Sequence, residues 1–147
     1  DTVARSVMRE RNLLHRSVFV VVRNAADELL VHRRAEWKDV WPGAWDIAGG
    51  GVVATGEAWD LAAARELAEE LGIVADLVYL GEGEYSDDVV RELARVYAVR
   101  SEGPFSLVDD EIVELAWLPM AELRDWVAER EVCPDSLALV LPRLDAP

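Results

Sequence analysis

The chain has 147 residues and a formal net charge of −14, with 52% hydrophobic and 30% charged residues. This size and composition indicate a single globular domain, 1–147, with an ordinary buried core. One cysteine, Cys133, excludes a disulfide scaffold and favours a reducing compartment. The acidic charge repels a phosphate backbone, and no apolar run approaches the ~20 residues that span a bilayer. We therefore expect a soluble cytoplasmic protein with neither nucleic acid nor a membrane as partner.

Two aliphatic runs near the start predict a hairpin. They cover residues 17–23 (SVFVVVR) and 28–34 (ELLVHRR), separated by the turn-forming residues 24–27. The segment 37–51 that follows is rich in tryptophan, glycine and proline. It has too many breakers for a helix and is too apolar for a linker. We expect a structured loop that ends in a short strand.

A helix is predicted over residues 57–71, which contain neither glycine nor proline and are followed by Gly72 at the C-cap position. Strands are predicted over 73–80, 91–100 and 112–118. Two helices should follow, from residue 119 to about residue 130 and from residue 134 to just before Pro142. Strands packed with helices in this order predict an α/β (α+β) sandwich with a mixed sheet.

Acidic residues are concentrated in the second part of the chain. Residues 1–56 carry 8 bases and 7 acids, whereas residues 57–147 carry 7 bases and 22 acids. A region that concentrates carboxylates must solvate them, pair them or give them a cation. For most of these acids a solvated surface is the simplest interpretation.

Three of these acids share one face of the predicted helix. At 100° per residue, Glu66, Glu69 and Glu70 lie within an arc of about 100°. The side chains expected to face the core lie on the opposite side of the helix: Leu61, Ala64, Leu67, Ala68 and Leu71. Carboxylate oxygens are the ligands that Mg²⁺ and Mn²⁺ prefer. From spacing alone, a metal platform and a solvated helix face both remain open.

The surrounding residues resemble the Nudix box at every defined position. Gly51 is followed after five residues by Glu57, and after seven more by RELAEELGI over residues 65–73. So many defined residue types within 23 positions make this a highly specific pattern. The resemblance implies a Nudix-type α/β/α sandwich. It also implies cleavage of a nucleoside diphosphate linked to another moiety, by water attack on phosphorus with Mg²⁺ or Mn²⁺.

The resemblance also implies roles for individual residues. Glu66, Glu69 and Glu70 would be the metal ligands, directly or through water, and one of them would orient the nucleophile. Arg65 would belong to the catalytic set by holding a carboxylate in place rather than by touching the substrate.

Three further box positions are expected to be structural. Glu57 would serve the start of the helix or the loop before it. Gly51 and Gly72 would serve the loop turn and the helix end.

The box does not assign the general base, which family members take from the box or from a later strand or loop. We place Glu92 in the catalytic set, as an additional ligand or as the base, because its strand could pass beside the helix. Glu111 and Glu114 are weaker candidates, for which a solvated turn is the simpler interpretation.

A second resemblance involves residues 15–52, and especially residues 32–46, which contain HRR, WK and WPGAWD. They are similar to the Nudix subgroup that includes isopentenyl-diphosphate isomerase. Those enzymes rely on a cysteine shortly after this segment and a histidine two positions later. The corresponding positions here hold Gly50 and Val52. Isomerase chemistry would therefore lack its acid/base group and part of its metal site.

The bases best suited to meet phosphates are Arg33, Arg34 and Lys38, although ordinary strand-end charges remain an alternative. Three tryptophans of the same region could stack on a base or pack in the core: Trp37, Trp41 and Trp45. Of these we assign Trp45 to the substrate. No functional signal attaches to His32 or Cys133, and a structural role is expected for His15.

Together these features predict a metal-dependent hydrolase of a small-molecule diphosphate, with a homodimer left open. The alternatives are an isomerase-like enzyme and a catalytically silent Nudix-fold module that binds a nucleotide. A silent module usually has a broken box, whereas this box is complete. No motif identifies the substrate.

Overall fold

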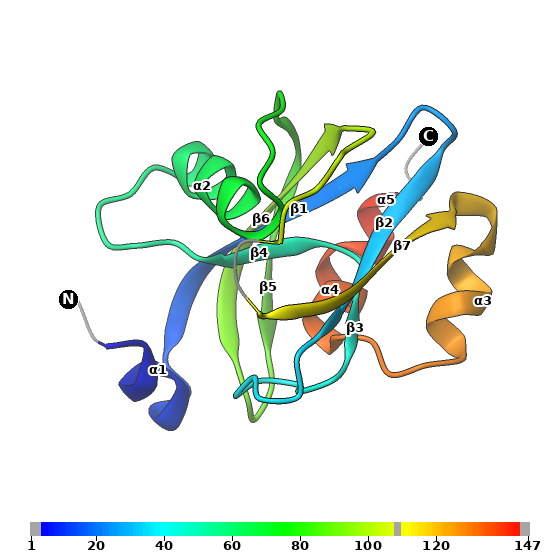
Figure 1. Ribbon diagram of the computed structural model, residues 1–147. Helices are drawn as coiled ribbons and strands as arrows, with labels where there is room; N and C mark the ends of the chain where they lie inside the picture. Colours follow the sequence, from blue (N-terminus) through cyan, green and yellow to red (C-terminus); the bar gives the residue numbers. More distant parts are fainter. Residues whose placement is uncertain (1–3, 108–109, 145–147) are drawn as a thin grey trace.

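A mixed sheet of seven strands forms the centre of the molecule (Figure 1). The structure is a computed structural model that describes residues 4–107 and 110–144. The strands are β1 (Leu14–Arg23), β2 (Glu28–Arg34), β3 (Trp45–Asp46), β4 (Gly49–Val52), β5 (Val78–Ser86), β6 (Arg91–Arg100) and β7 (Ile112–Pro119). The helices are α1 (Arg5–Arg11), α2 (Trp59–Leu71), the 3₁₀ turn η1 (Met120–Glu122), α3 (Leu123–Ala128), α4 (Pro134–Leu139) and α5 (Leu141–Leu144).

The strand order is β3-β2-β1-β6-β5, with β4 paired to β1 and β7 paired to β2. Strands β1 and β6 are parallel along their whole length, from Leu14↔Arg91 to Arg23↔Arg100. The predicted hairpin of β1 and β2 is antiparallel but pairs only at Arg23↔Leu29. Beyond that point β4 pairs with β1 over residues 17–20, while β2 pairs with β7.

Each face of the sheet packs against its own layer of helices. Successive residues of β1 point to opposite faces, so Val20 belongs to one core and Val21 to the other. The core that contains Val20 is covered by α2, and the core that contains Val21 is covered by α3, α4 and α5. Because both faces are covered, residues 17–22 are buried without interruption. The mixed-sheet sandwich expected from the sequence is confirmed.

Most predicted elements are present, but the bounds of several differ from those expected. Helix α2 begins two residues late and ends at Gly72, which has a φ of 68° and donates from its N–H to the carbonyl of Ala68. The strand predicted over 73–80 is wrong, because β5 runs from residue 78 to residue 86. Gly81 and Gly83 indicated a turn but lie inside the strand. A Cβ on Gly81 would lie 2.8 Å from Nε of Arg143, so the strand needs glycine where this side chain crosses it.

The end of the chain is more broken than the sequence predicts. The helix expected over 119–130 is a 3₁₀ turn followed by α3. The next predicted helix ends as α4 at Leu139, and α5 follows with Pro142 in its first turn. None of the described helices is long and apolar enough to cross a membrane.

Candidate active site

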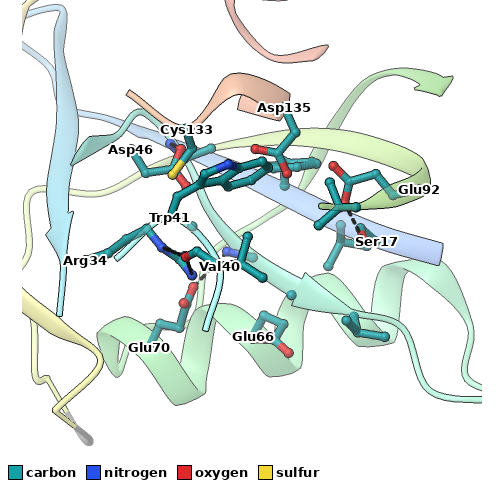
Figure 2. Close-up of a pocket in the computed structure, with 18 of the residues that line it drawn as sticks. Ser17, Arg34, Val40, Trp41, Asp46, Glu66, Glu70, Glu92, Cys133 and Asp135 are labelled. Atoms are coloured by element: carbon teal, nitrogen blue, oxygen red, sulfur yellow. Dashed lines mark hydrogen bonds between the residues drawn. The ribbon is translucent and has the colours of Figure 1, made fainter. Parts of the chain in front are cut away.

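A cavity of about 120 Å³ lies between α2 and the sheet (Figure 2). Its walls come from β1, β2, β4, α2 and β6, from the loop before β3 and from the segment that leads into α4. One wall carries the carboxylates of α2. The opposite wall carries a second set of polar side chains, described below as the far wall: Ser17, Asp46, Glu92, Cys133 and Asp135.

Helix α2 turns two of its glutamates toward the sheet. Glu66 and Glu70 both line the cavity. Glu69 is not among the lining residues, and 57% of its side chain is exposed. Of the residues expected to face the core, Leu67 and Leu71 are buried, but the prediction is wrong for Leu61, Ala64 and Ala68, which are exposed. The buried residues of α2 are Ala62, Ala63, Glu66, Leu67 and Leu71, while Leu61 is 66% exposed.

Glycines in β4 make room for the two carboxylates. A Cβ on Gly51 would lie 2.5 Å from Oε1 of Glu66, and a Cβ on Gly49 would lie 2.8 Å from Oε1 of Glu70. The backbone N–H of Gly50, between them, donates to Oε1 of Glu70 over 2.7 Å. Gly51 was expected at a loop turn but lies within a strand. Glycine is needed there for close approach of a carboxylate.

We expect Gly51→Ala to lower the affinity for Mn²⁺ or Mg²⁺ by ~10-fold or more, because the new methyl group must displace the Glu66 carboxylate. Isothermal titration calorimetry measures this affinity directly. Gly56→Ala is the matched control: its φ of 80° strains an alanine, but nothing lies within 4 Å of the added Cβ. Equal losses of affinity in the two variants would contradict the steric explanation.

The buried carboxylate of Glu66 and the half-buried carboxylate of Glu70 repel each other. The pKa of Glu70 is raised to about 8, first because the side chain is buried and then because of the charge of Glu66. A divalent cation between them would relieve both effects. Across 4–107 and 110–144, no group of three His, Cys, Asp or Glu side chains is already gathered for a metal ion. Mg²⁺ is commonly bound by one or two carboxylates together with substrate phosphates, so Glu66 and Glu70 fit this cation.

Arg65 donates hydrogen bonds to three of the four glutamates of the motif, Glu57, Glu66 and Glu69. Its Nε and Nη2 donate to the two carboxylate oxygens of Glu57 over 2.8 and 3.0 Å. Its Nη1 donates to Glu66 over 2.8 Å and to Glu69 over 3.2 Å. Glu57 also accepts from the backbone N–H of Ala54. The Arg65 hydrogen bonds, followed by this backbone bond, lower the pKa of Glu57 to about 2.

Two of the three predicted phosphate-binding bases line the cavity. Nε and Nη2 of Arg34 donate to the carbonyl of Val40 over 3.1 and 2.8 Å, which ties down the loop before β3. Nζ of Lys38 donates to Oε1 of Glu111 over 2.8 Å. Arg33 is not a lining residue; it lies 3.5 Å from Glu36 and 3.5 Å from Glu114 at the surface. Of the two weaker candidates for the general base, Glu111 lines the cavity and Glu114 does not.

The tryptophan in the cavity is not the one assigned to the substrate. Trp45 packs edge-on against Trp126 with ring centroids 5.4 Å apart, beside the core that contains Val21. Trp37 is 59% exposed. Trp41 lines the cavity, and Figure 2 shows its ring between the α2 wall and the far wall. Its φ of 45° is rare for a bulky side chain.

The far wall combines residues that are distant in the sequence. The hydroxyl of Ser17 donates to Oε2 of Glu92 over 2.8 Å, and Nε2 of His15 lies 3.8 Å from the same oxygen. Asp46 accepts from the hydroxyl of Ser136 over 2.5 Å. Glu92 was predicted from the sequence, whereas Ser17, Asp46 and Asp135 were not, because no spacing rule connects a β1 residue with the start of α4.

Two further residues of the cavity lining, His32 and Cys133, have shifted pKa values. Burial lowers the pKa of His32, so its imidazole stays neutral near pH 7. Burial and the neighbouring charge of Asp46 raise the pKa of the Cys133 thiol. A thiol in this environment stays protonated and is a poor nucleophile.

Comparisons with known proteins agree with this arrangement. The family model described as NUDIX domain matches residues 13–135. The chain is 38% identical over 147 residues to the Pseudomonas aeruginosa protein named Uncharacterized Nudix hydrolase PA4841, covering 99% of this chain and 86% of that protein. It is also 38% identical over 136 residues to Uncharacterized Nudix hydrolase YfcD of Escherichia coli K12, covering 91% of this chain and 74% of the relative.

Solved structures show the same fold. The crystal structure of DR0079 from Deinococcus radiodurans aligns with a TM-score of 0.75 and 26% identity, covering 90% of this chain and 83% of that one. The Nudix domain of Shewanella oneidensis NrtR, solved with ADP ribose, aligns with a TM-score of 0.70 and 17% identity, over 95% and 96% of the two chains. The family model, the sequence relatives and the glutamates facing a glycine strand lead to one conclusion: the chain belongs to the Nudix hydrolase family.

Proposed function

We propose that the protein is a metal-dependent pyrophosphohydrolase that cleaves the diphosphate linkage of a nucleoside diphosphate derivative or a related diphosphate. The observation that carries this proposal is the pair of carboxylates, Glu66 and Glu70, facing one cavity against a glycine strand. Two such groups with no cation between them cannot accept a diphosphate, which adds further negative charge. Mg²⁺ or Mn²⁺ fits the oxygen ligands.

The ligand set proposed for the cation is Glu66 and Glu70, with Glu69 as the third member. Glu69 reaches the site only by giving up Arg65, whose Nη1 it shares with Glu66. Arg65 therefore acts by holding Glu66 in place. When bound, the cation would neutralise phosphate oxygens and lower the pKa of a coordinated water.

Residues around the cavity are proposed to carry the other steps. Lys38 and Arg34 are the lining bases available to the phosphates, and both keep N–H groups beyond those already bonded. Glu92 is proposed as the general base, which receives a proton as water attacks phosphorus. Its Oε2 accepts a hydrogen bond from the hydroxyl of Ser17, which holds the carboxylate at the cavity. Trp41, rather than Trp45, is the ring available to stack on the substrate.

Isomerase chemistry is disfavoured by the backbone at Gly50, where the related isomerases carry cysteine. Gly50 has a φ of 149°, and a Cβ there would lie 1.9 Å from the carbonyl oxygen of Val18. No side chain fits this position while β4 pairs with β1. A silent binding module is disfavoured because the box glutamates and Arg65 are all present, with Arg65 bonded to Glu57, Glu66 and Glu69 and Glu70 held by the N–H of Gly50.

The test is a screen of nucleoside diphosphate derivatives with Mg²⁺ and with Mn²⁺, following release of phosphate and nucleoside monophosphate. We expect turnover of at least one class, loss of turnover in excess chelator and recovery when metal is restored. Full activity in chelator would rule out the proposed mechanism. Isopentenyl diphosphate is included in the screen, and its conversion to the dimethylallyl isomer would favour the isomerase alternative.

A further inference from the structure

The far wall contains a buried carboxylate whose two oxygens have different partners. Glu92 is 4% exposed, and its Oε2 accepts from the hydroxyl of Ser17 over 2.8 Å. Its Oε1 is equally buried, and no N–H or hydroxyl group of the described residues donates to it. A buried carboxylate oxygen without a donor costs free energy, so a donor should be present.

The carboxyl group of Asp135 can supply this donor. Asp135 is 7% exposed and lines the same cavity, and Figure 2 shows its carboxyl group facing that of Glu92. One of its oxygens, Oδ1, already accepts from the backbone N–H of Ser136 over 2.8 Å. Burial, followed by the neighbouring carboxyl group of Glu92 and the charge of Asp46, raises the pKa of Asp135 to about 10. Asp135 therefore keeps its proton at neutral pH.

We propose that Asp135 is a positioning residue whose protonated carboxyl group donates a hydrogen bond to Oε1 of Glu92. Together with the Ser17 hydroxyl on Oε2, this bond holds the Glu92 carboxylate in one orientation toward the cavity. The inference rests on the proposed function, in which Glu92 receives the proton of the attacking water. It adds a residue that no box position assigns and that reaches the site from α4.

The start of α4 is anchored independently of this bond. The backbone N–H of Cys133 donates to the carbonyl of Trp45 over 2.9 Å, and the hydroxyl of Ser136 donates to Asp46 over 2.5 Å. Removing the Asp135 side chain therefore leaves the helix attached to the sheet. Its effect on turnover can be separated from an effect on folding.

The experiment compares Asp135→Asn with Asp135→Ala, using the diphosphate substrate found in the screen. The asparagine amide donates as the protonated acid does and still accepts from Ser136, so we expect kcat within ~3-fold of the wild type. Alanine removes the donor, and we expect kcat to fall by ~10–100-fold, as is typical when a supporting hydrogen bond is lost. KM should change little in both variants, because neither removes a phosphate contact.

Two further variants keep the test decisive. Ser17→Ala removes the donor to Oε2 and should lower kcat in the same way, even if Asp135→Ala fails to fold. Ser136→Ala weakens the anchoring of α4 through Asp46, so it should lower the unfolding temperature and leave kcat unchanged.

Several outcomes would overturn the inference. One is an Asp135→Asn variant as impaired as Asp135→Ala, and another is wild-type kcat in Asp135→Ala or in Ser17→Ala. Glu92→Gln separates this inference from the proposed function. If Glu92→Gln is inactive while Asp135→Ala is normal, only the positioning role of Asp135 is lost. If Glu92→Gln turns over normally, the assigned base is wrong and the inference falls with it.

Discussion

Glu70→Gln is expected to lower turnover by more than ~100-fold while making the metal-free protein more stable. The glutamine Oε1 can still accept the hydrogen bond from the N–H of Gly50, so the local structure is kept. What is lost is the negative charge that a divalent cation requires. The stability rises because folding of the wild type must either protonate Glu70 or hold its charge beside Glu66, whereas glutamine is neutral at every pH.

The pH dependence of unfolding checks the stability part of this prediction. The folded-state pKa of Glu70 is about 8 against an ordinary 4.5, so the folded state holds this proton more tightly than the unfolded state. This contribution is present in full below about pH 4.5 and is lost as the pH rises toward 8. In chelator, the wild type should therefore lose a few kcal/mol over this window through this group, and Glu70→Gln should not.

Urea unfolding at pH 5, 7 and 9, beside the activity assay, gives both quantities. Glu69→Gln is expected to lower turnover as well, but without the gain in stability, because that side chain is 57% exposed. Glu84→Gln, exposed on β5 and not among the residues that line the cavity, removes one charge and should change neither quantity. A large loss of metal-free stability with near-normal turnover in both Glu69→Gln and Glu70→Gln would overturn the metal assignment.

Arg65→Ala is expected to lower the free energy of unfolding by ~2 kcal/mol and to reduce turnover strongly. The change removes hydrogen bonds to Glu57, Glu66, Glu69 and the carbonyl of Val52. Losing one partner of a fully buried ion pair costs about 3–5 kcal/mol, and the expected value is smaller because 34% of the Arg65 side chain is exposed. Turnover falls because Glu66 is no longer held.

Lysine cannot restore this network, because one ammonium group cannot replace a guanidinium fork that contacts three carboxylates. Arg65→Lys should therefore recover only part of the stability. Arg33→Ala is a matched control for stability: Arg33 is 35% exposed and also lies near two carboxylates, but at 3.5 Å and on the surface. We expect it to cost less than ~1 kcal/mol in urea unfolding. Equal losses for Arg33→Ala and Arg65→Ala would show that Arg65 has no special structural role.

The parts of the site that lie close together in the sequence were predictable. The spacing of Glu66 and Glu70 with Arg65, and the cap at Gly72, depend on helix geometry and on local motifs. The buried side of the helix was not predictable, because amphipathic reasoning places carboxylates in solvent. In this protein the glycines of β4 leave room for them beneath the helix. An expected surface thus becomes a cavity wall.

The parts of the site that depend on contacts between distant segments of the chain were not predictable. Glu92 was one of several acidic candidates in the sequence, and only the expectation that its strand passes beside the helix favoured it. Asp135 gave no signal, since its role arises where α4 meets the parallel pair of β1 and β6. The prediction of Trp45 instead of Trp41 failed for a similar reason. Trp45 lies in a short strand, and its side chain packs against Trp126 of α3. Trp41 lies in the loop before β3, which Arg34 holds through the carbonyl of Val40.

The far wall draws on residues 17, 46, 92 and 135, and this has a consequence for how the protein is made. The α2 wall can form once the first half of the chain has left the ribosome, since α2 and β4 are neighbours in sequence. The far wall requires hydrogen bonds between residues far apart in the sequence, 75 positions for Ser17 and Glu92 and 90 positions for Asp46 and Ser136, which close late because of their loop entropy. A nascent or truncated chain that ends before residue 133 can therefore present the α2 carboxylates without the group that orients Glu92. The cavity is therefore completed only after the residues that lead into α4 have been synthesised.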